Sequence, residues 1–394
     1  MALALSKKEN ILGATLLVSG CCIGAGMIGL PVLSAVAGFF PSFLAMLFAY
    51  CFTTATGLLL LEATLWFDKQ VNLLSIAQFA LGRVGKWVTG ALFLFLFYCI
   101  FVAYMDGGGQ LFSGLLSSLF HVPVSREIGI LSCAMLVGAI TYAGTRIVDG
   151  LNRSLMVGLI GSYCILVILG LPSVRLDNLL HVNWSATIAT VPVLLVCFGY
   201  QNLVPSLAHY LKKNVRALRL AIIMGNFLPL LLYFLWNFVI LGLLPPGNLA
   251  SQGQSDMVSG LLETATRSSS VLFFVKAFSF FALITSFLTI AISFVDFLKD
   301  GFRAQEKLHE GFIYALVLVP PMGFSLFYPH VFLQALSLAG GFADVLLFGA
   351  LPPLVVWVGR YMKQANGPYQ VAGGKWLLGF VFFLSLGLLG LKIF

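Results

Sequence analysis

Charged residues are scarce in this sequence of 394 residues. Only 9% of its positions are Asp, Glu, Lys or Arg, 60% are hydrophobic, and the mean hydropathy is +1.01. A soluble domain carries about 25% charged residues, so the composition excludes a soluble fold. It predicts an all-α polytopic membrane protein embedded in a lipid bilayer. The net charge of +8 indicates no nucleic-acid partner, because the basic residues lie between apolar segments and form no cluster.

Motifs for metal binding and catalysis are also missing. The seven cysteines include no Cys-x-x-Cys pair, and the five histidines are not spaced as metal ligands. A polytopic membrane enzyme would need a nucleophile, an acid–base pair or a metal cluster gathered at the membrane surface, and no such group is evident. We therefore expect no cofactor, no metal and no enzymatic activity. A membrane enzyme, a channel and a receptor that does not transport are the rival classes.

Long apolar segments are abundant. A helix needs roughly 20 apolar residues to cross a bilayer, and eleven segments of the chain provide them. These segments are residues 10–35, 39–66, 87–119, 127–145, 151–171, 184–210, 217–244, 270–298, 311–328, 331–358 and 374–393. Before the third of them, residues 67–86 show the pattern of an amphipathic helix on the cytoplasmic surface. The sequence thus predicts eleven transmembrane helices.

The basic residues predict the orientation of these helices. Cytoplasmic loops of membrane proteins are enriched in Lys and Arg. If the N-terminus lies in the cytoplasm, 17 of the 22 basic residues fall on the inner side. The remaining five are Arg126, Arg175, Arg267, Lys276 and Lys392. We therefore expect a cytoplasmic N-terminus and, after eleven crossings, a C-terminus outside.

The first apolar segment contains a stretch that is unsuited to a continuous helix. Residues 19–31 include four glycines and Pro31, which weaken or break a helix interior. Irregular backbone at membrane depth is tolerated where it lines a cavity, so we expect one half-helix to end within residues 21–27 and the next to begin near Gly26. The alternative is that the glycines serve close helix packing. The candidate substrate-binding residues are Cys21, Cys22, Ile23, Gly24, Ala25, Gly26 and Met27.

The sixth apolar segment repeats this feature. Residues 196–205 place a glycine and three consecutive polar side chains at mid-membrane and end at Pro205. Segments one and six are five helices apart and therefore enter the membrane from opposite sides, and paired interruptions in two inverted halves indicate a transporter's binding site. The candidates here are Cys197, Phe198, Gly199, Tyr200, Gln201 and Asn202. Hydrogen bonding of Gln201 and Asn202 across helices is the alternative interpretation.

Neither interruption contains Arg or Lys. A half-helix N-terminus offers free N–H groups and about half a positive charge, and unwound carbonyls can accept from an ammonium group. A zwitterionic amino acid would therefore be bound by backbone dipoles at these two interruptions.

A set of short motifs resembles one transporter family. The motifs are Ile-Gly-Ala-Gly at 23–26, Leu-Pro at 30–31, Leu-Leu-Leu-Glu at 59–62, Phe-Gly-Tyr at 198–200, Val-Pro-Ser at 204–206 and Phe-Tyr-Pro at 327–329. Over its whole length the chain resembles the bacterial aromatic amino acid permeases, and among them the tyrosine-specific branch. The resemblance implies import of an aromatic amino acid across the bacterial inner membrane by proton symport. Tyrosine is the first expectation and tryptophan the second; sodium coupling in the same fold is the alternative.

The resemblance also implies the fold. It is the LeuT-type fold of the APC superfamily, in which two inverted repeats of five helices are followed by an extra helix. We expect a single transmembrane domain over residues 1–394, with repeats at about 8–172 and about 183–358 and the extra helix at about 374–393.

Within that fold, the third helix flanks the substrate, and here it carries Tyr98 and Tyr104. Six helical residues turn by 240° beyond one full turn, so at most one tyrosine faces the site. Asp106 and Asp344 are acids inside predicted spans. An ionisable group at the bilayer centre costs about 2.5–3.5 kcal/mol and is functional by default, so both are candidates for binding the coupling proton. Packing of the tyrosines and structural hydrogen bonds of the acids are the alternatives.

Two further predictions depend on the resemblance. Thr285 and Ser286 lie where sodium-coupled carriers of this fold bind an ion, although their hydroxyls can instead bond the helix backbone. An inner gate is expected between the basic and acidic residues near the cytoplasm. The candidates for that gate are Lys7, Lys8, Asp296 and Asp300.

Overall fold

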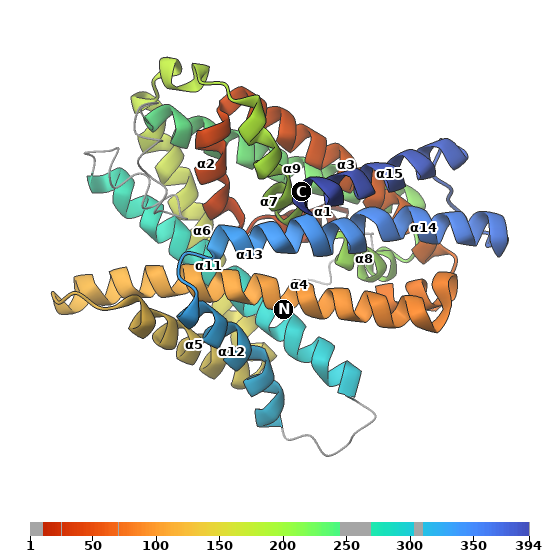
Figure 1. Cartoon of the computed structure of the whole chain (residues 1–394), viewed down its shortest axis with the longest axis horizontal. Coiled ribbons are helices and arrows are strands. Elements are labelled where there is room, and N and C mark those ends of the chain that lie inside the picture. Colours follow the sequence, from red (N-terminus) through yellow and green to blue (C-terminus); the bar gives the residue numbers. More distant parts are fainter. Residues whose placement is uncertain (1–10, 25, 70, 245–268, 303–309, 394) are drawn as a thin grey trace, which may run out of the picture.

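The computed structural model describes residues 11–24, 26–69, 71–244, 269–302 and 310–393, and this part of the chain is helical with short connections (Figure 1). The helices of the first half are α1 (Ile11–Cys22), α2 (Gly26–Ala37), α3 (Phe39–Leu65), α4 (Leu73–Phe120), α5 (Arg126–Tyr142), α6 (Thr145–Gly170), η1 (Leu171–Ser173) and η2 (Leu176–Leu180). Those of the second half are α7 (Trp184–Cys197), η3 (Gln201–Leu203), α8 (Val204–Tyr210), α9 (Val215–Leu243), α11 (Ser269–Phe302), α12 (Glu310–Phe327), α13 (Phe332–Leu338), η5 (Ala339–Ala350), α14 (Leu351–Trp357), η6 (Val358–Met362) and α15 (Gly374–Ile393).

The described helices support an all-helical membrane protein. Nine helical runs are long and apolar enough to cross a bilayer, and the bent pair α1–α2 makes ten. The fourth predicted segment, 127–145, is occupied by α5, which has 17 residues and falls short of the roughly 20 that a span needs. The prediction of a polytopic membrane protein is therefore confirmed. A count of eleven transmembrane helices would require the short α5 to cross the bilayer.

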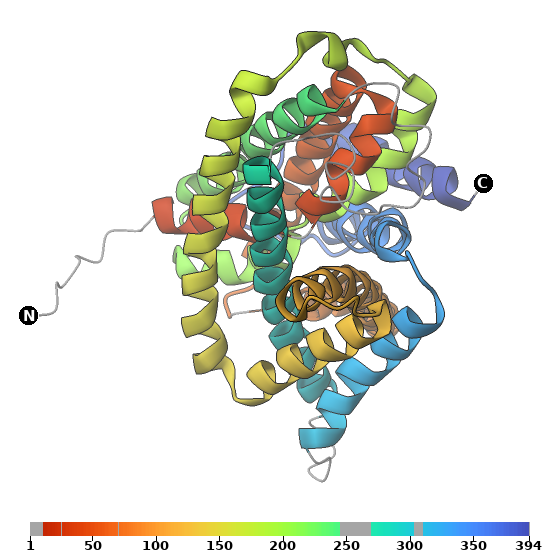
Figure 2. The same ribbon diagram turned by 90° about the vertical axis from the view of Figure 1, so that its left-hand side faces the viewer.

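The helices gather in two groups. Helices α1, α2, α3, α7, α8 and α9 pack on one another, and α4, α5, α11 and α12 form the second group, with α6 packed on α11. A span made of α13, η5, α14 and η6 (Phe332–Met362, the bridging span) lies between α4 and the first group in both views (Figures 1 and 2). Its start packs on α4 and its later part on α3. The bridging span therefore contacts both groups.

The predicted amphipathic helix at 67–86 is joined to the third span. Helix α4 begins at Leu73, where the Asn72 side chain accepts a hydrogen bond from the Ser75 N–H (2.9 Å). The helix bends at Gly82, whose φ of 71° is a backbone conformation open to glycine. The amphipathic turns and the following span therefore form one bent helix instead of two separate elements.

Candidate functional site

The first interruption lies where the sequence predicts it. Helix α1 ends at Cys22 and α2 begins at Gly26, with a bend of 59° between them. The Ile23 N–H donates to the Ser19 carbonyl (2.9 Å) and the Met27 N–H to the Gly24 carbonyl (3.0 Å). The prediction of two half-helices is confirmed; Ala25 itself lies outside the described residues.

The second interruption is confirmed as well. Helix α7 ends at Cys197, the next three residues are not helical, and α8 begins at Val204 after the short η3 turn. Pro205 occupies the first turn of α8, where its missing N–H costs no helical hydrogen bond.

The two interruptions lie against each other. The Cys21 thiol donates to the Gly199 carbonyl (3.4 Å), and its sulfur lies 4.0 Å from the Asn202 amide oxygen. A Cβ atom at Gly26 would lie 2.6 Å from the Cys197 sulfur, so glycine allows the start of α2 to approach the end of α7. Residues 178 positions apart are thus brought into contact.

The three polar residues of the second interruption divide between two roles. The Tyr200 hydroxyl donates to the Thr53 carbonyl (3.0 Å), and the buried Gln201 amide donates to the Thr56 hydroxyl (3.3 Å). The cross-helix alternative therefore describes Gln201, and Tyr200 behaves in the same way. Asn202 is exposed, as is Cys21 beside it. Both residues are therefore accessible in the middle of their spans.

A cavity of about 280 Å³ borders Pro205, in the first turn of α8. It lies between the end of α3 and helix α8. Its lining residues are Thr64, Phe67, Asp68, Lys69, Val71, Pro205, Ala208, His209, Lys212 and Lys213. Three lysines among them indicate the side that is predicted to be cytoplasmic.

Helix α9 supports both interruptions, although no motif in the sequence marks it as part of the site. The buried Tyr233 hydroxyl bonds the carbonyls of Cys22 and Cys197, and the Trp236 indole donates to the Met27 carbonyl (3.0 Å). The buried Asn226 amide donates to two threonine hydroxyls of α3, each at 2.9 Å. The sequence does show polar side chains inside this apolar segment, and such side chains need partners within a membrane. It does not show which residues those partners are.

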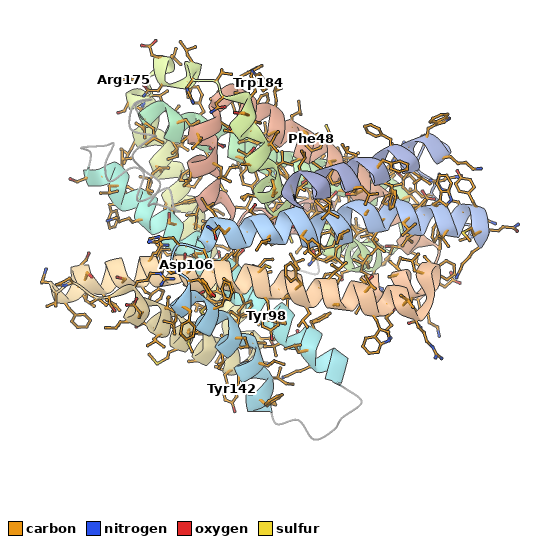
Figure 3. The ribbon with its side chains drawn as sticks, viewed as in Figure 1. Phe48, Tyr98, Asp106, Tyr142, Arg175 and Trp184 are labelled. Carbon is orange, nitrogen blue, oxygen red and sulfur yellow. The ribbon has the colours of Figure 1, made fainter. Side chains whose placement is uncertain are left out.

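The two candidate tyrosines of α4 point to different neighbours. Tyr104 is buried and contacts Ser286 and the Phe287 ring. The Tyr98 hydroxyl instead donates to the Leu316 carbonyl of α12 (3.0 Å), on the side away from the first group of helices (Figure 3). Of the two, Tyr104 is therefore the one that contacts a residue beside the first interruption, and its role toward the substrate stays a prediction.

The two hydroxyls of α11 also differ. The Thr285 hydroxyl donates to the Phe281 carbonyl one turn earlier (2.7 Å), which is the backbone bonding anticipated as its alternative. Ser286 lies at the first interruption, because a Cβ atom at Gly24 would be 2.5 Å from the Ser286 hydroxyl oxygen. Only Ser286 is thus placed beside the candidate substrate residues.

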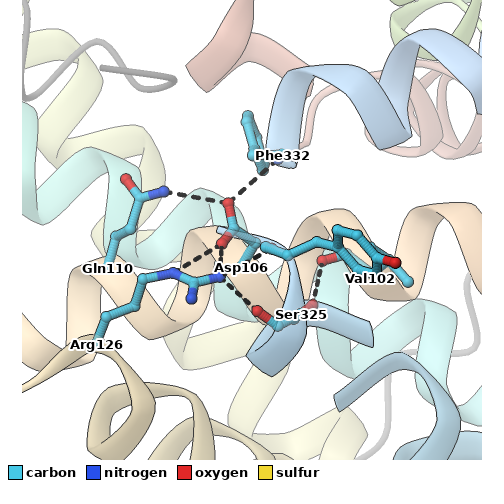
Figure 4. A network of polar contacts seen from close by, with 7 residues as sticks. Val102, Asp106, Gln110, Arg126, Ser325 and Phe332 are labelled. Carbon is cyan, nitrogen blue, oxygen red and sulfur yellow. Dashed lines mark hydrogen bonds and ion pairs between the residues drawn. The ribbon is translucent and has the colours of Figure 1, made fainter. Parts of the chain in front are cut away.

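Asp106 is fully buried in a network of donors (Figure 4). Its carboxylate pairs with Arg126 at the start of α5 and accepts from the Gln110 amide (3.2 Å) and the Phe332 N–H (3.1 Å). Arg126 also donates to the Ser325 carbonyl near the end of α12 (2.6 Å). The pair therefore caps two helix ends at once, with the carboxylate at the N-terminus of α13 and the guanidinium at the C-terminus of α12.

Asp344 lies in the middle of the bridging span, in the π-helical element η5. It is 6% exposed, and within the described part of the chain its carboxylate has no hydrogen-bond or ion-pair partner. A Cβ atom at Gly199 would be 3.8 Å from its Oδ2 atom. The acid therefore borders the second interruption, and π-helical turns are frequent at functional sites.

Most of the candidate side chains for the inner gate lie outside the described residues. Lys7 and Lys8 lie outside them, and so does the side chain of Asp300. Asp296 is exposed on α11. The gate therefore stays a prediction.

A second buried ion pair joins α3 to the end of the bridging span. The Arg360 guanidinium donates to both carboxylate oxygens of Glu62 (2.6 and 2.5 Å), and the Val371 N–H donates to the same carboxylate (2.8 Å). Both side chains are at most 6% exposed. In the sequence, Glu62 is visible only as part of a motif, because its partner is 298 positions away.

The sequence model of the tryptophan/tyrosine permease family matches residues 7–391 of the chain. The chain belongs to this family. It is 33% identical to the tyrosine-specific transport system 1 of Haemophilus influenzae, over 97% of this chain and 95% of the relative. It is 28% identical to the tryptophan-specific transport protein of the same species, over 96% and 94%. The glutamine transporter 2 of Aliivibrio fischeri is also 28% identical, over 96% and 98%.

Membership in this family confirms the resemblance seen in the sequence motifs. The relatives are transport systems and permeases, so the chain is a multi-span membrane transporter and not an enzyme. The family name also supports an aromatic amino acid as the class of substrate.

Proposed function

We propose that this transporter imports aromatic amino acids, with tyrosine as the preferred substrate, across a bacterial inner membrane by proton symport and alternating access. The observation that carries the proposal is the meeting of the two helix interruptions, at Cys21 and Gly199. Two broken helices in matching positions of inverted halves form the substrate site of many transporters. The tyrosine-specific relatives favour tyrosine over tryptophan.

The substrate's zwitterionic end fits the helix ends at this site. The N-terminus of α2, at Gly26, suits a carboxylate because it is the positive end of the helix dipole. Carbonyls of the unwound residues 198–200 and the exposed Asn202 amide suit an ammonium group. Tyr104, which contacts Ser286 at the first interruption, is the aromatic residue that we assign to the substrate ring.

For proton coupling we assign Asp344 ahead of Asp106. The Asp106 carboxylate already accepts from Arg126, Gln110 and the Phe332 N–H. Neutralising this carboxylate would leave a partly buried guanidinium without its partner. Asp344 borders the second interruption, so substrate and proton would be bound by neighbouring groups. In this proposal the Arg126 pair keeps a structural role.

Sodium coupling is the second candidate, and one contact favours it. Ser286 lies directly beside Gly24 at the first interruption. A serine hydroxyl and unwound carbonyls are oxygen ligands of the kind a hard cation prefers.

We further propose that the chain has the LeuT-type inverted repeat and a cytoplasmic N-terminus. With that orientation the cavity lined by Lys69, Lys212 and Lys213 opens toward the cytoplasm. It would then be the inner exit route.

Uptake of labelled tyrosine into proteoliposomes tests the proposal. Saturable uptake that is competed by tryptophan but not by glutamine, and that accumulates tyrosine under an imposed proton gradient without sodium, is the expected result. Uptake that requires sodium would replace proton coupling with the second candidate. Competition by glutamine alone would overturn the aromatic substrate class.

A further inference from the structure

Tyr233 of α9 is shared by the two helix interruptions. Its hydroxyl oxygen lies 2.6 Å from the Cys22 carbonyl and 3.0 Å from the Cys197 carbonyl. Cys22 is the last residue of α1, and Cys197 is the last residue of α7. A single side chain from a third helix therefore contacts the same position of both broken helices.

This contact provides a hydrogen-bond donor to the carbonyls at two helix ends. The last carbonyls of a helix have no N–H partner within that helix, and a buried acceptor without a donor is destabilising. Tyr233 is fully buried, and its one hydroxyl hydrogen is shared between the two carbonyls. The half-helix ends of α1 and α7 are thus held at a fixed separation by one donor.

The surroundings of Tyr233 hold it in place. The Phe198 ring meets its ring edge-on, with centroids 5.2 Å apart. One turn further along α9, the Trp236 indole donates to the Met27 carbonyl at the start of α2 (3.0 Å) and packs on Phe278 of α11, with centroids 4.5 Å apart. Helix α9 therefore fixes both sides of the first interruption and the near side of the second.

We infer that Tyr233 is a positioning residue of the substrate site: its hydroxyl sets the spacing between the ends of α1 and α7, and so the spacing of the groups that bind the zwitterion. The inference rests on the proposed function. It does not require Tyr233 to touch the substrate. Loss of the hydroxyl should therefore weaken substrate binding while the helices still assemble.

The test compares Tyr233→Phe with Tyr314→Phe in the full-length protein in proteoliposomes. Tyr314 makes the matched control, because its hydroxyl also donates to a helix carbonyl, that of Thr141 (3.1 Å), but between α12 and α5. We expect Tyr233→Phe to raise the KM for tyrosine about tenfold, with Vmax per inserted molecule within about twofold of wild type. The control is expected to change neither value.

Two non-natural residues at position 233 separate the hydrogen bond from packing. 4-Aminophenylalanine retains a donor and should return KM to within about threefold of wild type. 4-Fluorophenylalanine fills the space of the hydroxyl without donating, so it takes the place of Tyr233→Phe if that variant does not insert, with the same expected rise in KM.

The outcomes distinguish this inference from the proposed function. Wild-type protein that takes up no tyrosine refutes the proposed function. Normal wild-type uptake with an unchanged KM in the Tyr233 variants refutes the positioning role alone. Failure of both donor-free variants to insert also refutes it, because the hydroxyl would then be needed for folding and not for spacing the site.

Discussion

An ion-paired carboxylate lies at each end of the bridging span, whereas the carboxylate in its middle has no such pair among the described residues. At its start, Asp106 accepts from the Phe332 N–H and pairs with Arg126. At its end, Arg360 pairs with Glu62 of α3. Between them, Asp344 is buried with no partner among the described residues. The Asp106 and Glu62 carboxylates at the ends accept hydrogen bonds from donors of the protein itself. The Asp344 carboxylate in the middle is available to bind a proton.

The two end pairs also connect different parts of the molecule. The Asp106 pair ties the bridging span to α4, α5 and α12, and the Glu62 pair ties it to α3 of the other group. Between these two ends, η5 carries Asp344. Substitutions of Asp344 and Asp106 test this difference directly, and substitutions of Gly26 and Ser286 test the first interruption.

The largest effect is expected for Asp344→Asn. The amide is similar in size but cannot bind and release a proton, so accumulation of tyrosine under a proton gradient should fall below about a tenth of wild type. Exchange of labelled for unlabelled tyrosine, which needs no net proton movement, should persist. Wild-type accumulation by this variant would remove Asp344 from the coupling role.

Gly26→Ala is expected to weaken tyrosine binding strongly, because its new Cβ atom would lie 2.6 Å from the Cys197 sulfur. The next nearest atom is 3.7 Å away, so the added substitution Cys197→Ala should relieve the clash. We expect KM to rise about tenfold in the single variant and to return most of the way in the double variant. If KM does not recover in the double variant, Gly26 is needed for the backbone conformation and not for this contact.

Asp106→Asn should act on stability more than on binding. Breaking a buried ion pair by removing one charge costs about 3–5 kcal/mol, so the melting temperature of the purified protein should fall clearly. Arg126→Gln is the matched variant and should give a similar fall. Loss of proton-driven accumulation at wild-type stability would instead place the coupling proton at Asp106.

The smallest effect is expected for Ser286→Ala. If a proton drives uptake, removal of this hydroxyl should change the initial rate of tyrosine uptake by less than about threefold. A carrier that depends on sodium would lose its sodium stimulation in this variant. The measurement is uptake at fixed membrane potential with and without sodium.

Local signals in the sequence were sufficient to place the two interruptions. Glycine and proline in residues 19–31 and 196–205 change the backbone at those positions, and helices end at Cys22 and Cys197 as expected. The apolar segments likewise give the spans, except that 127–145 yields the short α5. These features depend on neighbours in sequence, which is why they could be predicted.

The contacts that hold the site together could not be predicted in the same way. The sequence places Arg126 in a loop, and nothing local shows that it pairs with Asp106. Tyr233 and Arg360 have partners from about 36 to 298 positions away. Gln201 and Asn202 are adjacent and chemically alike, yet one is buried against Thr56 and the other is exposed. Their roles follow from packing between distant helices.

The reactivity of Cys21 tests most directly whether the meeting of the two interruptions is the substrate site. Cys21 is exposed and its neighbour Cys22 is buried, so two variants that each retain one of these cysteines as the sole thiol form a matched pair. A hydrophilic methanethiosulfonate reagent should modify Cys21 much faster than Cys22, and saturating tyrosine should slow the modification of Cys21 by about tenfold. Modification of Cys21 at the same rate with and without tyrosine, in protein that transports tyrosine, would contradict the account.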